Sequence, residues 1–329
     1  RNAPMDRFWI DKISSLKPYV PGEQPTSDTL IKLNTNEHAL PPAESVLAVL
    51  KSASGEALRR YPDPTASALR SVISAAESVP PDHIFVGNGS DEVRARPWVG
   101  LLKGRRVPTL DTTYGFYPVW AGLYDADLAE VPVLADFSVD VDALKNDDAA
   151  VVLANPKAPT GRALKRDHIA SLVDSIRGRL VVVDEAYFGF GAETAVPLVA
   201  DHDNLIVTRS LSKSHALAGM RVGYAIAQPG LIEGLNRVKD SFNSYPLDAI
   251  AQAVAAAAIQ DKQWLMDASQ QVREVREVMS AGLQTIGFEV LPSQANFIFT
   301  EHQSLGGKQI FDALRARDIL VRRWDKPRL

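Results

Sequence analysis

The sequence has 329 residues, 46% hydrophobic and 23% charged, which is ordinary for a globular enzyme of about two domains. A formal net charge of −4 argues against a nucleic-acid-binding protein, and the lack of cysteine excludes disulfides and thiolate metal sites. The six histidines show no metal-ligand spacing, so we expect no metal site. The N-terminal stretch has no apolar signal region, and no run of about 18 apolar residues occurs. We therefore expect a cytoplasmic protein that does not bind membranes.

The predicted elements begin with an arm and continue into a large domain. Residues 1–40 are rich in proline and polar groups, and they are expected to form an extended arm that belongs partly to a small domain. Residues 41–240 are expected to form the large domain, beginning with helices over 43–53 and 64–79. Short β-branched runs then predict strands at 84–88, 149–155, 179–187, 204–210 and 222–227.

Most of these runs are too continuously apolar for strands with one face in water. They fit strands of a mainly parallel sheet that is buried on both faces. Helical stretches such as 165–177 separate several of them, so the expected fold class is α/β. Residues 241–329 are expected to form a smaller α+β domain. Its predicted helices are 247–260, 262–283 and 307–317, and its predicted strands lie within 287–292, 295–300 and 318–324.

Polar residues follow four of the predicted strands of the large domain, at the point where each strand ends. The segments are GNGSDE (87–92), NPKAPTG (155–161), DEAY (184–187) and RSLSKS (209–214). In open α/β sheets the carboxyl ends of the strands form the edge where ligands bind. The glycines and first helical residues of GNGSDE suit an anion, but the same residues are also typical of a simple capped turn.

Two residues in these segments suggest chemistry. Asp184 follows three valines, so its buried carboxylate needs a partner, either a protonated pyridine nitrogen or an arginine. Lys213 is flanked by serines and is followed by Arg221, a set that suits a phosphate. An amine held near a phosphate and a carbonyl can form a Schiff base, although a solvated lysine in a polar loop has the same sequence pattern.

Taken in order, the motifs resemble those of fold-type I aminotransferases, which use pyridoxal phosphate (PLP). More narrowly, the sequence is similar to the histidinol-phosphate aminotransferase branch. The resemblance covers nearly the whole chain and implies a three-layer α/β/α large domain. It rests on the motifs LNTNE (33–37), RRYPDP (59–64), GNGSDE (87–92), TTYGFYP (112–118), NPKAPTG (155–161), DEAY (184–187), SLSKS (210–214) with Arg221, and PSQANFIF (292–299).

The resemblance implies a role for each matching residue around the cofactor. Lys213 would carry the cofactor as a Schiff base and then act as the general base, and Asp184 would pair with the pyridine nitrogen. Tyr187 and Asn155 would hydrogen-bond the ring hydroxyl oxygen, and Tyr114 would stack on the ring. The residues implied to hold the phosphate are Ser90, Asp91, Ser210, Ser212 and Arg221.

Further residues are implied for the substrate and for the partner subunit. Asn36 and Glu37 would lie near the substrate, and Arg322 is the candidate for its anionic end. Tyr61 would reach the phosphate of the partner's site, so a homodimer is implied.

The implied reaction is transamination between L-histidinol phosphate and 2-oxoglutarate, a step of histidine biosynthesis. An aromatic amino-acid aminotransferase and a threonine-phosphate decarboxylase share the scaffold and remain alternatives. A PLP-binding protein without catalysis is a fourth reading, of a different class, and fold alone does not choose among them.

The sequence departs from the family pattern in two places that bear on the site. Arg94, Arg96 and Pro97 are poor choices for the buried helix that follows GNGSDE. The chain stops at 325–329, before a strand that carries a substrate-binding arginine in the family. We therefore expect the small domain to be incomplete and to lack that arginine.

Overall fold

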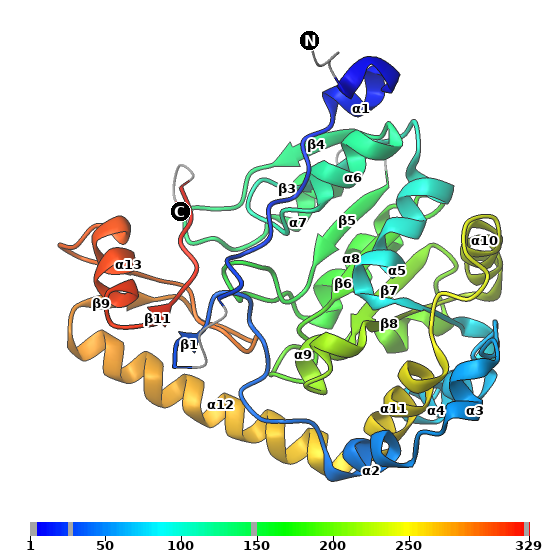
Figure 1. Cartoon of the computed structure of the whole chain (residues 1–329). Helices are drawn as coiled ribbons and strands as arrows, with labels where there is room; N and C mark the ends of the chain where they lie inside the picture. The colour runs from blue at the N-terminus through cyan, green and yellow to red at the C-terminus, as the bar shows by residue number, and fades with distance from the viewer. Residues whose placement is uncertain (1–4, 26–28, 146–149, 326–328) are drawn as a thin grey trace.

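A five-stranded sheet forms the centre of the protein, in a computed structural model that describes residues 5–25, 29–145, 150–325 and 329. The strand order is β2-β8-β7-β6-β5, and Figure 1 labels the strands β5, β6, β7 and β8 of this sheet. Only β8 is antiparallel to its neighbours, so the other four point the same way and the prediction of a mainly parallel sheet is confirmed. The bounds are β2 (Ile84–Asn88), β5 (Val151–Ala154), β6 (Val181–Glu185), β7 (Leu205–Ser210) and β8 (Val222–Ala227).

Alternating residues of the strands enter two hydrophobic cores, one on each face of the sheet. Val151 and Leu153 of β5 belong to one core and Val152 belongs to the other, as the two-residue repeat of a strand requires. The first core is covered by α2 (Glu44–Ser52), α4 (Ser67–Glu77), α8 (Arg166–Ser175) and α11 (Ala249–Gln260). The second is covered by α5 (Gly89–Pro97), α6 (Tyr117–Tyr124) and α10 (Pro229–Asp240). The large unit is therefore a three-layer α/β/α structure, as the resemblance implied.

Shorter elements surround this sandwich. Strand β3 (Arg106–Leu110) pairs in parallel with β4 (Asp127–Val131) and lies beside β5, where Thr109 Oγ1 donates to the carbonyl of Val152 at 2.9 Å. The remaining short elements are η1 (Met5–Phe8), α1 (Asp11–Ser15), α3 (Gly55–Arg59), η2 (Pro81–His83), η3 (Trp98–Leu102), α7 (Val141–Lys145), η4 (Val196–Ala200), α9 (Leu211–Ser214) and η5 (Ala218–Met220).

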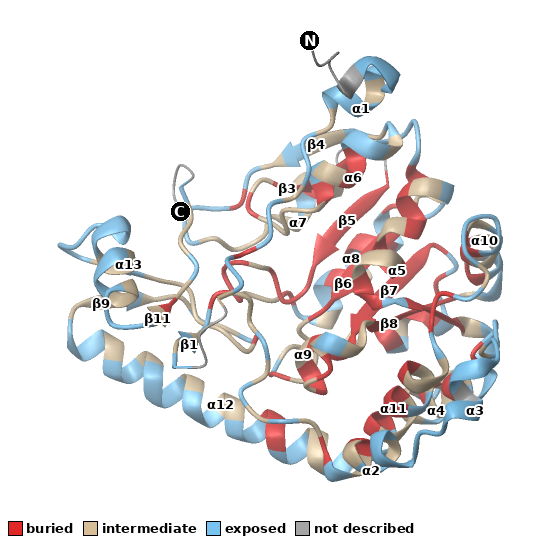
Figure 2. Ribbon diagram, viewed as in Figure 1, coloured by how far each residue is buried: buried red, intermediate tan, exposed pale blue. Residues whose placement is uncertain are grey.

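The last third of the chain meets the N-terminal arm. The long helix α12 (Lys262–Thr285) is largely exposed (Figure 2) and leads to the hairpin β9 (Phe288–Val290) and β10 (Thr300–His302). After α13 (Gly307–Arg315), β11 (Ile319–Leu320) pairs in parallel with β1 (Ile31–Lys32). None of the described helices is long and apolar enough to cross a membrane.

Two details of the sequence prediction are wrong. Within the described part of the arm, residues 5–8 and 11–15 are short helical turns rather than extended chain. The last hairpin strand lies at 300–302 instead of 295–300, because its register is set by pairing with residues 288–290. The local pattern of apolar residues contains no information about that pairing.

Candidate active site

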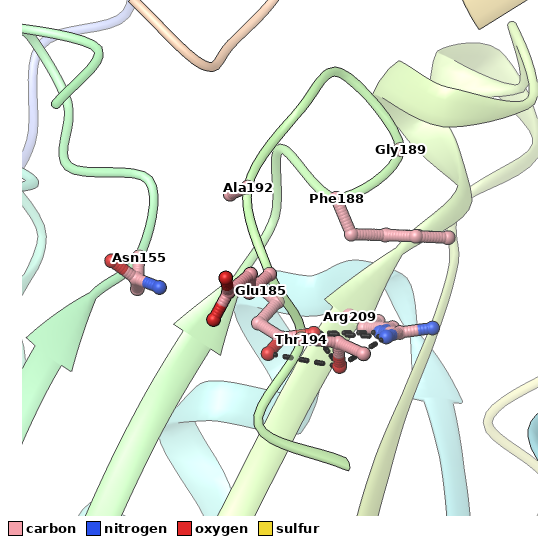
Figure 3. A pocket seen from close by; sticks show the side chains of 8 residues that line it. Asn155, Glu185, Phe188, Gly189, Ala192, Thr194 and Arg209 are labelled. Atoms are coloured by element: carbon pink, nitrogen blue, oxygen red, sulfur yellow. Dashed lines mark hydrogen bonds and ion pairs between the residues drawn. The ribbon is translucent and has the colours of Figure 1, made fainter. Parts of the chain in front are cut away.

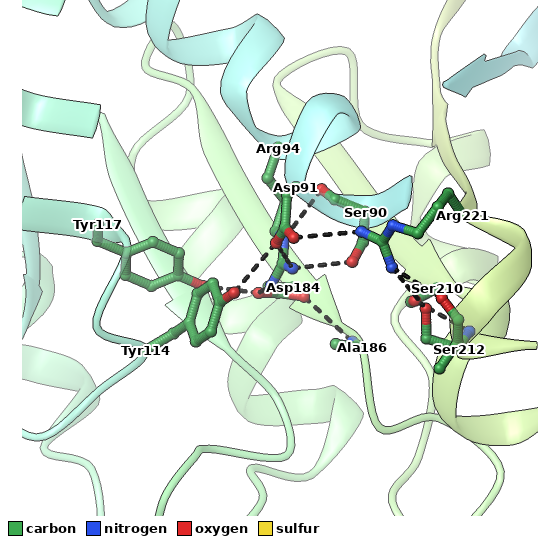
Figure 4. Close-up of polar contacts among 11 residues, drawn as sticks. Ser90, Asp91, Arg94, Tyr114, Tyr117, Asp184, Ala186, Ser210, Ser212 and Arg221 are labelled. Atoms are coloured by element: carbon green, nitrogen blue, oxygen red, sulfur yellow. Dashed lines mark hydrogen bonds and ion pairs between the residues drawn. The ribbon is translucent and has the colours of Figure 1, made fainter. Parts of the chain in front are cut away.

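The carboxyl ends of β2, β5, β6 and β7 meet at one edge of the sheet, as predicted. Helix α5 starts directly after β2, and α9 starts directly after β7. Most of the residues predicted for the cofactor come from the segments after β2, β6 and β7, and Figure 4 shows several of them around Asp184.

The start of α5 and Arg221 form an anion cradle. The side chain of Asn88, which precedes α5, makes no capping hydrogen bond, and Glu92 accepts from the backbone nitrogen of Asn88. Among the described side chains none bonds the N–H groups of residues 89–91, so these remain available to an anion. A Cβ on Gly223 would lie 2.6 Å from the backbone nitrogen of Ser90, so β8 packs directly against this turn. Arg221 Nη1 lies 3.5 Å from Ser212 Oγ, and Arg221 Nη2 lies 3.4 Å from Asp91 Oδ2. Serine hydroxyls, helical N–H groups and a guanidinium are the donor set that a phosphate needs.

Ser210 is close to the cradle but has a structural contact of its own. It is the last residue of β7, and its Oγ accepts a hydrogen bond from the Ser212 backbone at 3.1 Å, capping α9. Its hydroxyl can still donate to an anion while it accepts this bond.

Asp184 is the second-last residue of β6 and is only 2% exposed, and its carboxylate accepts three hydrogen bonds from protein groups. Its Oδ2 accepts from Arg94 Nη1 at 2.5 Å and from the Tyr117 hydroxyl at 2.9 Å, and its Oδ1 accepts from the Ala186 backbone at 3.1 Å. Burial raises the pKa of Tyr117 well above its usual value, so the phenol stays protonated and donates. The structure thus has the arginine partner that the sequence analysis offered as one alternative, but the sequence did not identify it as Arg94 and did not predict Tyr117.

Tyr114 lies beside this cluster (Figure 4). Its hydroxyl donates to Asp91 Oδ1 at 3.0 Å, and the guanidinium carbon of Arg94 sits 4.5 Å from its ring centre. The predicted stacking of Tyr114 on a cofactor ring stays a prediction. In this structure, however, Arg94 covers a face of the Tyr114 ring.

Lys213 extends from α9 to the N-terminal arm. Its Nζ donates to the carbonyl of Thr35 at 2.5 Å, a contact that the sequence did not predict. Burial lowers the pKa of Lys213 from 10.5 to about 8. The nearby cations Lys32 and Arg94 act in the same direction, and the carboxylate of Glu37 acts against them. A substantial fraction of this amine is therefore neutral, and so nucleophilic, slightly above neutral pH.

This shift predicts how the reactivity of Lys213 depends on pH. Labelling of the cofactor-free protein with an acylating reagent, quantified peptide by peptide by mass spectrometry, should show Lys213 becoming reactive with a midpoint near pH 8. The exposed Lys51 controls for reagent access. Because the unfolded chain holds this proton up to pH 10.5, the contribution of Lys213 to stability should rise between about pH 8 and 10.5. A labelling midpoint above pH 10 would contradict the assignment.

The predicted substrate residues lie next to Lys213. Asn36 Nδ2 donates to the Tyr187 hydroxyl at 3.1 Å, and burial raises the pKa of Tyr187. Burial acts to raise the pKa of Glu37, but hydrogen bonds from Lys32 and Thr35 outweigh it and leave that pKa lowered. The structure therefore brings Asn36 together with the predicted cofactor ligand Tyr187.

Arg322 is exposed and reaches the same part of the arm. A Cβ placed on Gly22 would lie 3.2 Å from Arg322 Nη1 and 2.9 Å from the methyl group of Thr35. Arg322 therefore lies near Thr35, whose carbonyl accepts from Lys213, and its role at the anionic end of a substrate stays a prediction.

Two other predicted residues make different contacts. The Asn155 side chain accepts from the Leu164 backbone nitrogen at 2.7 Å and donates to the Leu164 carbonyl at 3.3 Å, so both ends of its amide are bonded. Tyr61 is 82% exposed and stacks on Tyr245 with ring centres 4.7 Å apart. The role of Asn155 at the cofactor and the role of Tyr61 in a partner's site both stay predictions.

A small cavity of about 160 Å³ lies next to this edge (Figure 3), but only Asn155 among the predicted site residues lines it. Its polar wall is an ion-pair network in which Arg209 binds Glu185 at 2.9 Å and Thr194 Oγ1 at 2.7 Å. Because these groups satisfy one another, the cavity belongs to the supporting structure of β6 and β7.

Comparison with known proteins agrees with this architecture. Histidinol-phosphate aminotransferase from Sinorhizobium meliloti, solved in complex with pyridoxal-5'-phosphate, superimposes with a TM-score of 0.85 at 24% identity, over 96% of this chain and 89% of that one. The fold is thus that of the fold-type I aminotransferases. The family model "Aminotransferase class I and II" matches residues 28–329, and the chain belongs to this family.

Two curated relatives are more similar in sequence. Histidinol-phosphate aminotransferase 1 of Bradyrhizobium diazoefficiens is 52% identical over 99% of this chain and 93% of its own length. Histidinol-phosphate aminotransferase of Gluconacetobacter diazotrophicus is 50% identical over 99% of this chain and 92% of its own length.

Proposed function

We propose that this protein is a PLP-dependent aminotransferase that transfers the amino group of L-histidinol phosphate to 2-oxoglutarate, in histidine biosynthesis. The observation that carries the proposal is that one edge of the sheet brings three groups together. They are the amine of Lys213 with its lowered pKa, the anion cradle at Arg221 and the buried carboxylate of Asp184. The high identity to curated histidinol-phosphate aminotransferases supports the choice of substrate.

The residues present fit PLP at its phosphate and at its point of attachment. The first turn of α5, with Ser90 and Asp91, and the side chains of Ser212 and Arg221 would hold the phosphate, while Lys213 would hold the cofactor covalently. Asp184 and Tyr114 would bind the ring. When bound, the cofactor supplies an electron sink for the carbanion character that develops at the substrate Cα.

The remaining roles, which are charge stabilisation, hydrogen bonding and proton transfer, are assigned to side chains of the protein. Asp184 offers a buried negative charge that favours a protonated partner nitrogen. Tyr187, held by Asn36, offers a hydroxyl at the same edge. Lys213 is the positioned base that moves the proton at the substrate Cα, and its lowered pKa keeps part of the amine neutral for that task.

The anionic end of the substrate is assigned to Arg322. It is exposed, reaches the Thr35 neighbourhood and is always charged, so it suits a phosphate monoester. Glu37, whose carboxylate is held by Lys32 and Thr35, is the residue to which we assign polar groups of the substrate.

We also propose a cytoplasmic homodimer, with an arm at residues 1–40, a large domain at 41–240 and a small domain at 241–329. The exposed stack of Tyr61 on Tyr245 supports a contact surface there, with Tyr61 reaching the partner's site.

The test is steady-state formation of glutamate from 2-oxoglutarate with three amino compounds in parallel. L-histidinol phosphate should be the preferred donor. Turnover with phenylalanine alone would move the protein to the aromatic aminotransferases, and release of CO₂ from L-threonine O-3-phosphate would move it to the decarboxylases. Cofactor binding without any turnover would leave a non-catalytic PLP-binding protein.

A further inference from the structure

Arg94 is a buried cation in the middle of the proposed cofactor site, and the proposed function gives it no role. It is 6% exposed and belongs to α5. Its Nη1 donates to Asp184 at 2.5 Å, its Nη2 to Asp91 at 2.7 Å and to Ser90 Oγ at 2.8 Å, and its Nε to the Ser90 carbonyl at 3.0 Å. Its guanidinium also lies over the ring of Tyr114.

These contacts explain why a helix with arginines in its first turns can be buried. Burial acts to lower the pKa of Arg94, but Asp184, Tyr114 and Asp91 outweigh it and hold that pKa well above its usual value. The guanidinium therefore stays charged, and its charge is matched by carboxylates. Arg96 is also buried, with an ion pair to Glu92 and the ring of Phe242 as partners.

Arg94 contacts Asp184 and Tyr114, the two residues that the proposed function assigns to the cofactor ring. A guanidinium is a flat cation that donates N–H groups to a carboxylate and stacks on an aromatic face. A protonated pyridine ring has the same three properties. The face of Tyr114 that Arg94 covers cannot hold a ring as well, and Oδ2 of Asp184 already accepts two hydrogen bonds.

We propose that Arg94 is an internal competitor of the cofactor ring, which must displace the guanidinium from Asp184 and Tyr114 before it can bind. This inference rests on the proposed function, because the competing group is the ring of PLP. In the cofactor-free protein Arg94 neutralises Asp184, which would otherwise be a buried carboxylate whose partners among the described residues are Tyr117 and the Ala186 backbone. Arg94 therefore stabilises the cofactor-free protein and weakens its affinity for PLP.

The test compares Arg94→Leu with wild type in two measurements that do not depend on turnover. The dissociation constant of PLP is measured by equilibrium dialysis, and the melting temperature of the cofactor-free protein by calorimetry. Arg94→Leu should bind PLP about tenfold more tightly or better, since no buried ion pair has to be broken, and should melt at a lower temperature without cofactor.

Arg96→Leu is the matched control, because Arg96 is equally buried on the same helix but contacts neither Asp184 nor Tyr114. Its PLP affinity should stay close to that of wild type. Arg94→Gln, which keeps a hydrogen-bond donor without the charge, makes the same comparison if the leucine variant does not fold. Equal or weaker PLP binding by both Arg94 variants overturns the inference while leaving the proposed function intact. Absence of PLP binding in every protein, wild type included, overturns both.

Discussion

Lys213→Ala is expected to reduce glutamate formation from L-histidinol phosphate and 2-oxoglutarate by about 10⁴-fold. The variant loses the only group at this edge to which we assign covalent attachment of the cofactor, and it loses the base at the substrate Cα. The contact from Lys213 Nζ to Thr35 is a single hydrogen bond on the arm, so its loss should leave the fold intact. The measurement is steady-state turnover at saturating PLP.

Lys213→Arg is the companion variant. It keeps a cation at the position, but a guanidinium remains charged and does not act as a nucleophile or base near neutral pH. Both variants should bind PLP without covalent attachment: after borohydride reduction, wild type should yield a cofactor-bearing Lys213 peptide, and neither variant should yield a cofactor-bearing lysine peptide. An alanine variant that retains a tenth of wild-type activity would contradict the assignment.

Arg209→Met is expected to lower the free energy of unfolding by about 3–5 kcal/mol. Arg209 is 4% exposed, and its guanidinium binds Glu185 at 2.9 Å and Glu77 at 2.5 Å while covering the ring of Phe188. The variant leaves the carboxylate of Glu185, whose side chain is 2% exposed, without a cation. Denaturant unfolding of the cofactor-free protein measures the loss.

The control for Arg209 is an arginine of the surface. Arg237 pairs with Glu233 on α10 at 2.8 Å, but the two side chains are 79% and 61% exposed. Arg237→Met should therefore change the unfolding free energy by less than about 1 kcal/mol. Equal effects of the two variants would show that the buried ion pairs of Arg209 with Glu185 and Glu77 stabilise the protein no more than an exposed pair does.

The sheet could be predicted from the sequence because its signal is local. Runs such as 205–210 and 222–227 are apolar and β-branched, and the structure has strands at those residues. The polar segments after β2, β6 and β7 also follow from chain order, since parallel strands bring their carboxyl ends together. The direction of β8, against its neighbours, depends on long-range pairing that no local pattern records.

The cluster around Asp184 could be predicted only in part. Its burial follows from the three valines before it, but its partner Arg94 comes from a helix 90 positions earlier in the chain. Read locally, Arg94 is only a poor residue for a buried helix, and its ion pair forms only when the folded sheet brings Asp184 of β6 within reach of α5. Tyr117 was missed for a related reason, because the aromatic cluster 114–117 does not indicate which hydroxyl reaches Asp184.

The most direct test of the central claim is a single-turnover experiment on the PLP-loaded protein. L-histidinol phosphate is added in stoichiometric amount without any keto acid, and both the cofactor absorbance and the ketone product are measured. We expect loss of the aldehyde form of the cofactor with one equivalent of imidazole-acetol phosphate per site, and recovery of that form when 2-oxoglutarate is added. An unchanged spectrum and no ketone, in a protein whose Lys213 carries the cofactor, would contradict it.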